Sequence, residues 1–235
     1  MPPELTLGQA TLCIVTALPK EIAAARIVFS PINQVNGKSG TIYDLCSIPS
    51  IGGQTVVAMT LLTEMGNNLA AAHTINVLND CENVRDVIMV GIAGAIPCPY
   101  DAEKHVRLGD LVVSGKHGVL QFDLGKQENG KPFECRSVPT RPSSILSNAV
   151  NQLLSMVEAN RHPWETYIDQ ASIAHPDCKR PDQSVDILDD GKGPIPHPYD
   201  PKRRHGAPRL FVGAIASSNH VLKDAAKRDA IVATA

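Results

Sequence analysis

The sequence predicts an α/β protein in which helices flank a twisted, mixed β-sheet. Two observations carry this prediction. Short apolar runs rich in β-branched residues alternate with segments whose apolar residues recur at the spacing of a helix. Glycine and proline residues stand at the junctions between these runs, where the chain has to turn. Strands that alternate with helices in this way form a largely parallel or mixed sheet.

The N-terminal half alternates predicted strands with predicted helices. Pro19 directly follows an apolar run and indicates the first turn of a helix, because the fixed φ angle of proline suits that position. Gly52 and Gly53 separate two β-rich runs and predict a hairpin. The predicted strands span residues 11–18, 41–48, 54–62, 86–92 and 108–114, and the predicted helices span residues 19–29 and 67–78.

The C-terminal half is less regular. Residues 143–158 carry an apolar stripe at helical spacing, which predicts an amphipathic helix. Residues 161–208 are dense in Pro, Asp, Lys and His and show little periodicity. We therefore expect a single domain over residues 10–235 with an irregular surface insertion at about 160–208. A buried strand and a further helix are predicted over residues 209–217 and 219–235.

The composition narrows the classes of partner. The chain has 235 residues, with 22 Lys and Arg against 24 Asp and Glu, so no basic field is available to bind nucleic acid. It has no run of about 18 successive apolar residues, the length that a membrane-spanning helix requires. The six cysteines form no C-x-x-C pair and no Cys/His cluster at the spacing of a zinc site. These features predict a cytoplasmic protein that binds a small molecule and needs neither a metal nor a cofactor.

Two glycine-containing segments stand at the ends of predicted strands. In the first, Gly91 and Gly94 flank small apolar residues, and in the second a Gly-Asp pair opens another strand. Glycine lets the backbone approach a ligand closely, and N–H groups at the carboxyl end of a strand bind polar ligand atoms. Together the segments Val90–Pro97 and Val106–Ser114 resemble the nucleoside phosphorylase and nucleosidase superfamily, whose members cleave the bond between a base and ribose.

Two further segments sharpen this resemblance. Leu18–Glu21 reads Leu-Pro-Lys-Glu, and Ile215–Asp224 reads Ile-Ala-Ser-x-Asn-x-Val-x-Lys-Asp. Both are most similar to the nucleosidase domains of immune-receptor-like multidomain proteins, some of which remove the base from ATP or other purine nucleotides. The resemblance implies a nucleoside phosphorylase-type fold and a purine nucleoside or nucleotide as the partner. It also implies water or phosphate as the second substrate, and self-association into a homo-oligomer.

Glu21 is the candidate catalytic residue. It lies just beyond the carboxyl end of the first predicted strand, where α/β folds bind ligands, and the resemblance implies that its carboxylate activates water. Phosphorylases of this fold usually carry a glycine-rich phosphate loop at this place, and the lack of one here favours hydrolysis over phosphorolysis. A purely structural role is the alternative, because the helix dipole stabilises a carboxylate in the first turn of a helix.

The resemblance also implies which residues contact the substrate. Turns at the ends of four predicted strands provide backbone groups and apolar side chains for the sugar and the base. The substrate-binding candidates are Ala17, Leu18, Met65, Gly66, Asn67, Ile92, Ala93, Gly94, Ser217, Asn219, Val221 and Leu222. A structural alternative stays open for three of them, in which Met65 belongs to the core, Gly66 permits a turn and Asn67 or Asn68 caps a helix. Asp110 supports the fold in the family, and a structural role is expected for it here.

The predicted function is hydrolysis of the N-glycosidic bond of purine nucleosides or nucleotides. A phosphate-dependent phosphorylase and a catalytically incomplete purine-binding or sensor domain are the alternatives. A dehydrogenase is disfavoured, because no G-x-G-x-x-G segment follows the first strand. In the family, a Glu-Met-Glu segment that binds ribose and an Asp that protonates the base would follow Ala235. Two expectations stay open on this point, a fragment of a longer protein or a shortened homologue.

Overall fold

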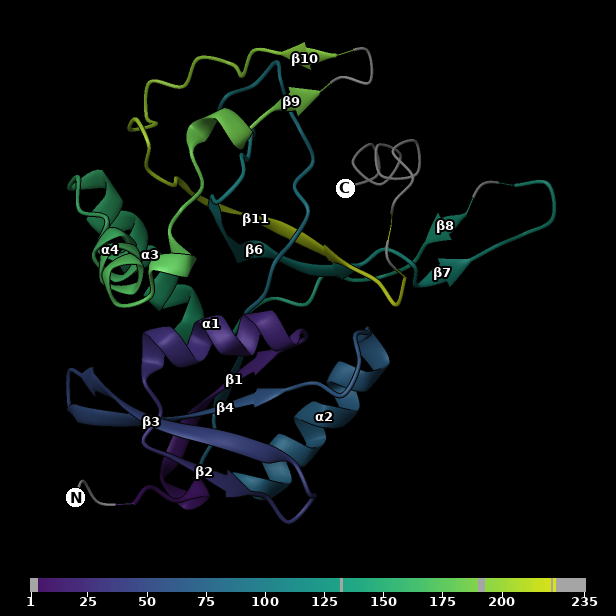
Figure 1. The fold of residues 1–235 in the computed structure, drawn as a ribbon. Helices are drawn as coiled ribbons and strands as arrows, with labels where there is room; N and C mark the ends of the chain where they lie inside the picture. The colour runs from purple at the N-terminus through teal and green to yellow at the C-terminus, as the bar shows by residue number, and fades with distance from the viewer. Residues whose placement is uncertain (1–3, 132, 190–192, 221, 223–235) are drawn as a thin grey trace. The chain divides into compact units, whose positions relative to one another are not determined.

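The computed structural model describes residues 4–131, 133–189, 193–220 and 222. These residues fall into two compact units, residues 1–93 and residues 94–235. The first unit is purple and blue in Figure 1, and the second is teal, green and yellow. The helix predicted over 219–235 lies almost entirely outside the described residues. Within the described part of the chain, no helix is long and apolar enough to cross a membrane.

The first unit contains a five-stranded mixed sheet. Its strands lie in the order β2-β3-β4-β1-β5. Both neighbours of β1, which are β4 and β5, run parallel to it, whereas β3 runs antiparallel to β2 and β4. The strands are β1 (Ala10–Thr16), β2 (Asn33–Asn36), β3 (Ile42–Ser50), β4 (Gly53–Leu61) and β5 (Asp86–Met89), and the helices are α1 (Pro19–Phe29) and α2 (Asn67–Asp80). The predicted mixed sheet with flanking helices is confirmed, as is the hairpin at Gly52 and Gly53.

The two helices of this unit pack on opposite faces of the sheet (Figure 1). Successive side chains of a strand point to opposite faces, so one strand serves two cores. In β1, Cys13 packs into a core that includes Val77 of α2, whereas Ile14 packs with Ile22 and Ala25 of α1. This alternation buries both faces of the sheet and explains why the central strands are continuous apolar runs.

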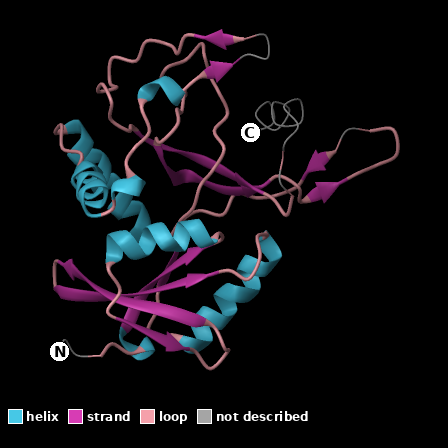
Figure 2. Ribbon diagram, in the orientation of Figure 1, coloured by secondary structure: helices cyan, strands magenta, loops and turns pink. Residues whose placement is uncertain are grey.

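The second unit is built from paired strands and longer connections (Figure 2). Strands β6 and β11 pair in parallel, and two short antiparallel pairs, β7 with β8 and β9 with β10, lie outside this ladder. The strands are β6 (Leu111–Gln121), β7 (Gly125–Lys126), β8 (Glu134–Cys135), β9 (Leu188–Asp189), β10 (Pro194–Ile195) and β11 (Leu210–Ser217). The helices are α3 (Ser144–Glu158) and α4 (Pro163–Ala174), and short 3₁₀ turns lie at Leu7–Gln9 in the first unit and at Pro176–Cys178 and Gln183–Val185 in the second.

Two elements of the second unit differ from the sequence-based expectation. The strand predicted over 108–114 begins only at Leu111 and continues to Gln121, because the residues before it form a turn closed by Asp110. Helix α4 was missed, since only a few apolar side chains, among them Trp164 and Ile168, lie on its half-buried face. Helix α3 is confirmed, and the hydroxyl of its N-cap residue Ser143 accepts a hydrogen bond from the backbone N–H of Leu146 at 3.2 Å.

Candidate functional site

The predicted site segments of the first unit begin at one edge of its sheet. Because β1, β4 and β5 are parallel, their carboxyl ends meet at the same edge, which is where open α/β sheets bind ligands. The carbonyl of Thr16 accepts a hydrogen bond from the N–H of Leu62 at 2.8 Å, and the carbonyl of Val15 accepts one from Val90 at 2.9 Å. The three chain segments that leave these strands therefore start side by side.

The Glu21 carboxylate joins two of these segments. It is buried, with 8% of the residue exposed. One carboxylate oxygen, Oε2, accepts hydrogen bonds from the backbone N–H groups of Ala17 at 2.9 Å and Leu18 at 2.8 Å. The other, Oε1, accepts a hydrogen bond from the N–H of Ile92 at 2.8 Å. Four residues predicted for the site, the candidate base and three candidate contacts, are thus in direct contact within this unit.

Gly91 makes this arrangement possible. A Cβ atom added at this position would lie 2.8 Å from Oε1 of Glu21 and 3.1 Å from its carboxyl carbon, closer than real Cβ contacts. A side chain at position 91 would force the Glu21 carboxylate to shift away from the loop after β5. The glycine in this segment therefore serves the close approach of a loop to a side chain of α1.

The turn between β4 and α2 contains the other predicted residues of this unit. Gly66 precedes α2 as its N-cap and has φ 141°, a backbone conformation that favours glycine. The side chain of Met65 is exposed, and Asn67 is the first residue of the helix. Ile92 is also exposed, although its backbone N–H is engaged by Glu21. Ala93 is the last residue of the first unit, and Gly94 is the first of the second.

A buried polar pair lies close to this edge of the sheet. The Thr60 hydroxyl on β4 and Nε2 of His73 on α2 are 3.2 Å apart. Burial lowers the pKa of His73, and the negative charge of Asp80 opposes this shift. No feature of the sequence marks His73 as a site residue, because a single histidine on a helix is not part of a recognisable motif.

The predicted residues of the second unit follow β11. Ser217 ends this strand, Leu222 is half-buried, and Val221 lies outside the described residues. The backbone N–H of Asn219 donates a hydrogen bond to Oδ2 of Asp123 at 2.9 Å, and the hydroxyl of Ser218 donates to the same oxygen at 2.9 Å. Asp123 itself was not predicted, because it follows β6 in a stretch that carries no recognisable motif.

The surroundings of Asp123 favour its ionised form. Burial alone would raise the pKa of this carboxyl group, but hydrogen bonds from the Asn219 N–H and from the side chains of Gln121, Ser218 and His220 lower it to about 2. The Gln121 amide donates to the second carboxylate oxygen, Oδ1, at 2.8 Å. Both oxygens are therefore held by donors on the two strand ends.

Asp110 has a structural setting, in agreement with the expectation. Its side chain is fully buried and accepts two hydrogen bonds from the guanidinium group of Arg203, at 2.8 and 2.6 Å. The backbone N–H groups of Arg107 and Arg209 donate to the same carboxylate at 2.7 and 2.9 Å. This carboxylate fastens the turn before β6 to the segment before β11.

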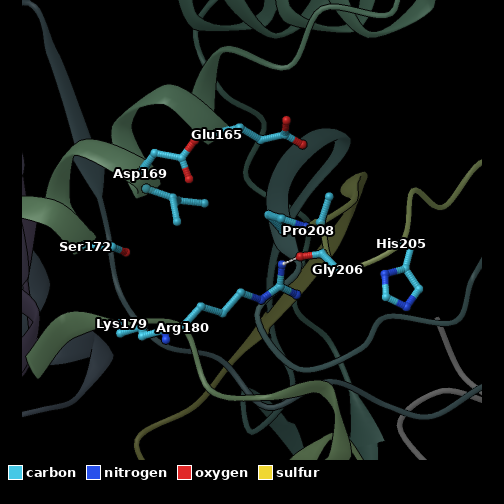
Figure 3. A pocket seen from close by; sticks show the side chains of 10 residues that line it. Glu165, Asp169, Ser172, Lys179, Arg180, His205, Gly206 and Pro208 are labelled. Carbon is cyan, nitrogen blue, oxygen red and sulfur yellow. Dashed lines mark hydrogen bonds between the residues drawn. The ribbon is translucent and has the colours of Figure 1, made fainter. Parts of the chain in front are cut away.

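A cavity of about 400 Å³ lies elsewhere in the second unit, beside α4 (Figure 3). Carboxylates from the helix, Glu165 and Asp169, line it together with the basic side chains of Lys179, Arg180 and His205. The Arg180 guanidinium group donates a hydrogen bond to the carbonyl of Gly206 across part of this hollow. None of the predicted site residues lines the cavity, so it is separate from the strand ends described above.

Comparison with known proteins places the fold. No protein-family model matches the chain. A nucleotide-binding leucine-rich repeat (NLR)-like protein of Hyaloscypha variabilis is 31% identical over an alignment 244 residues long, and the alignment covers 96% of this chain. The chain spans about a quarter, 24%, of the length of that curated relative.

Solved structures of nucleosidases share the fold at low sequence identity. The 5′-methylthioadenosine/S-adenosylhomocysteine nucleosidase of Helicobacter pylori, bound to butyl-thio-DADMe-Immucillin-A, has a TM-score of 0.54 and 14% identity, covering 96% of this chain and 71% of that one. The corresponding enzyme of Neisseria meningitidis, bound to methylthio-immucillin-A, has a TM-score of 0.53 and 16% identity, covering 94% and 70%. Futalosine hydrolase of Helicobacter pylori has a TM-score of 0.52 and 15% identity, covering 96% and 71%. The chain therefore has the nucleoside phosphorylase-type fold, which it shares with these nucleosidases, as its sequence motifs predicted.

Proposed function

We propose that this chain hydrolyses the N-glycosidic bond of a purine nucleoside or nucleotide, with Glu21 as the general base. The observation that carries the proposal is the buried Glu21 carboxylate at the carboxyl edge of three parallel strands. The solved structures that share the fold are purine nucleosidases, two of them bound to immucillin inhibitors. Both observations support hydrolysis at this edge, with the substrate class drawn from the resemblance.

The contacts of Glu21 suit a general base. A carboxylate has about four acceptor sites, and three backbone N–H groups fill three of them here. The orientation of the group is thereby fixed, and acceptor capacity remains for a water molecule. In the proposed step, the water oxygen forms a bond to C1′ of the ribose while the bond from C1′ to the base breaks. Glu21 accepts the proton that the water loses, and the departing base takes up a proton as it leaves.

The same contacts also support a structural role for Glu21. Its side chain reaches back from the first turn of α1 to the N–H groups that precede the helix, as in a capping box. The two roles make different predictions. A cap contributes to stability alone, whereas a general base contributes to the rate of the chemical step.

Replacement of Glu21 separates these roles. Glu21→Gln keeps the size of the side chain but loses the base and puts an amide NH₂ where a backbone N–H is donated. We expect base release to fall about 10²- to 10⁴-fold and the free energy of unfolding to fall by about 1–3 kcal/mol. The assay incubates the protein with ATP, AMP, adenosine, inosine or methylthioadenosine, with and without phosphate, and quantifies the free base by chromatography. Circular dichroism identifies temperatures at which the variant is folded.

Glu82→Gln is the matched control. Glu82 lies in the same unit, and its exposed side chain makes only a 3.6 Å ion pair with Lys38, so the same substitution should leave base release unchanged. A folded Glu21→Gln variant that releases base at the wild-type rate would exclude Glu21 as the base. Ribose 1-phosphate formed only when phosphate is present would assign phosphorolysis. Saturable nucleotide binding without base release would assign a purine sensor.

Three further expectations accompany the proposed activity. We expect one cytoplasmic domain over residues 10–235, and self-association that sedimentation analysis can measure. The match to part of a longer NLR-like protein supports a place for this activity within a larger protein of that kind.

A further inference from the structure

We propose that Asp123 is a positioning residue that holds Ser218, Asn219 and His220 in the arrangement that contacts the substrate. This inference rests on the proposed function and on the expectation, implied by the sequence resemblance, that the segment after β11 contacts the substrate. It adds to that function a residue from a different strand. The order of the chain alone does not connect the two, since Asp123 and Asn219 are 96 residues apart in the sequence.

Asp123 follows the carboxyl end of β6, and the residues that it contacts, Ser218 to His220, follow the carboxyl end of β11. The two strands are parallel, and Gln121 pairs with Ser217 at the last step of the ladder. The carbonyl of Ser217 accepts a hydrogen bond from the N–H of Phe122 at 3.1 Å. The ladder thus continues to Phe122, the residue before Asp123, and both strands present their carboxyl ends together (Figure 1).

One carboxylate oxygen then organises the segment beyond the ladder. Oδ2 of Asp123 accepts hydrogen bonds from the Ser218 hydroxyl and the Asn219 N–H, each at 2.9 Å. Nδ1 of His220 lies 3.3 Å from the same oxygen. An ionised carboxylate only accepts hydrogen bonds, so Nδ1 of His220 is the donor in this contact. The Ser218 hydroxyl oxygen in turn accepts the backbone N–H of His220 at 2.9 Å.

These contacts fix the direction of three successive residues through one side chain. Hydrogen bonds to a charged acceptor are shorter and stronger than those between neutral groups. A preorganised segment binds a ligand more tightly, because little ordering remains to be done on binding. Asp123 itself faces the segment that it holds, so its effect on the substrate passes through the positions of Ser218, Asn219 and His220.

The test compares the wild-type chain with Asp123→Asn. Asparagine keeps one acceptor oxygen but loses the charge and the second oxygen. We expect the KM for the best purine substrate to rise about 10- to 100-fold while kcat changes less than about threefold, since the lost interaction serves binding. Hydrogen exchange measured by mass spectrometry should become faster for the backbone amides of residues 217–220. Ser218→Ala removes one donor and keeps the carboxylate, and it should show the same split between KM and kcat with a smaller rise in KM.

Asp186→Asn is the matched control. The Asp186 side chain is 14% exposed and that of Asp123 17% exposed, and both lie in the second unit. Asp186 accepts hydrogen bonds from Nε of Arg107 at 2.7 Å and from the N–H of Leu108 at 3.3 Å, away from the ends of β6 and β11. The substitution Asp186→Asn should lower the free energy of unfolding without raising KM.

The outcomes separate this inference from the proposed function. An active wild-type chain whose folded Asp123→Asn and Ser218→Ala variants keep the wild-type KM would overturn the positioning role alone. An equal rise of KM in Asp186→Asn would also overturn it, because general loosening of the unit would then explain the effect. The proposed function would be overturned, and the positioning role with it, if the wild-type chain released no base from the five purine nucleosides and nucleotides and showed no binding to them in calorimetry.

Discussion

The two units of the chain are stabilised by different interactions. Among the described residues, every buried apolar side chain except Leu188, Pro208, Leu210 and Phe211 lies in the first unit. The second unit instead buries charged pairs. The side chains of Asp110 and Arg203 are 0% and 11% exposed, and Arg209 is paired with Asp200 at 2.7 Å.

This difference indicates which kinds of substitution destabilise each unit. An apolar core loses stability in proportion to the volume that is removed from it. A buried ion pair loses little when both partners are replaced together, but a single replacement leaves an uncompensated charge. The first unit should therefore respond to changes in size, and the second to changes in charge. Three measurements test this difference between the two units.

Asp110→Ala should have the largest effect. It would leave the buried Arg203 guanidinium group without its carboxylate and two backbone N–H groups without an acceptor. We expect a loss of about 3–5 kcal/mol of unfolding free energy. Trp164, the only tryptophan of the chain, lies on α4 and reports unfolding of the second unit by fluorescence. The control in the same unit is Glu134→Gln, whose exposed ion pair with Arg136 should contribute about 0–1 kcal/mol. Equal losses of unfolding free energy in the two variants would contradict the view that buried ion pairs stabilise the second unit.

Leu45→Ala should have a slightly smaller effect, this time on the first unit. Leu45 on β3 is fully buried in the core on the α2 face of the sheet. Removal of its side chain leaves a cavity, and we expect a loss of about 3 kcal/mol. Hydrogen exchange of the β3 and β4 amides measures this loss directly in the first unit. Ile51→Ala, at a fully exposed residue of the same unit, is the control and should change stability by less than about 0.5 kcal/mol.

Mild acid should have the smallest effect, and it should act on a buried histidine pair of the second unit. The N–H of Cys98 donates to Nδ1 of His105 at 3.2 Å, so neutral His105 carries its proton on Nε2. That proton points to Nδ1 of His197 at 2.9 Å, and Nε2 of His197 donates to the carbonyl of Asp186 at 2.8 Å. The chain of hydrogen bonds is complete only when both rings are neutral.

The direction of the acid effect follows from the pKa of His105. Burial, and then the positive charges of His197, Arg107 and Arg203, lower this pKa from its ordinary value of 6.5, against the opposing charge of Asp186. Below pH 6.5 the unfolded chain therefore binds a proton that the folded chain excludes. The stability contributed by neutral His105 is fully present above pH 6.5 and is lost as the pH falls toward the lowered pKa. Urea titrations followed by Trp164 fluorescence at pH 7.5 and pH 5.5 measure this loss, and His105→Gln should reduce the difference between them. A His105→Gln variant with the same pH dependence as the wild type would assign the effect to other groups.

The sequence predicted the first unit more fully than the second. Strands with continuous apolar runs, Pro19 at the start of α1 and the Gly52-Gly53 hairpin all express local preferences. In the second unit the turn before β6 and helix α4 were not predicted, because few apolar residues mark them. Elements held by charged side chains have no periodic apolar pattern, and their partners lie far away in the sequence.

The candidate site divides in the same way. Its first part, Glu21 after a strand and a glycine-containing loop, was predicted from motifs. The hydrogen bond between Glu21 and the loop was not predicted from the sequence, because Glu21 and Ile92 are 71 residues apart. Asp123 was missed altogether, because its role follows from the parallel pairing of β6 and β11.

Sequence patterns alone predict the α/β class, the helices and all strands of the first unit except β2, and a carboxylate just beyond the first strand. These features depend on neighbours within a few residues, through backbone preferences and apolar periodicity. The tertiary structure is needed to identify the N–H groups that donate hydrogen bonds to Glu21 and the carboxylate that accepts hydrogen bonds from the segment after β11. It is also needed to identify the charged side chains that are buried together. Such contacts join residues that are distant in the chain, and they form only when the strands that carry those residues pair side by side.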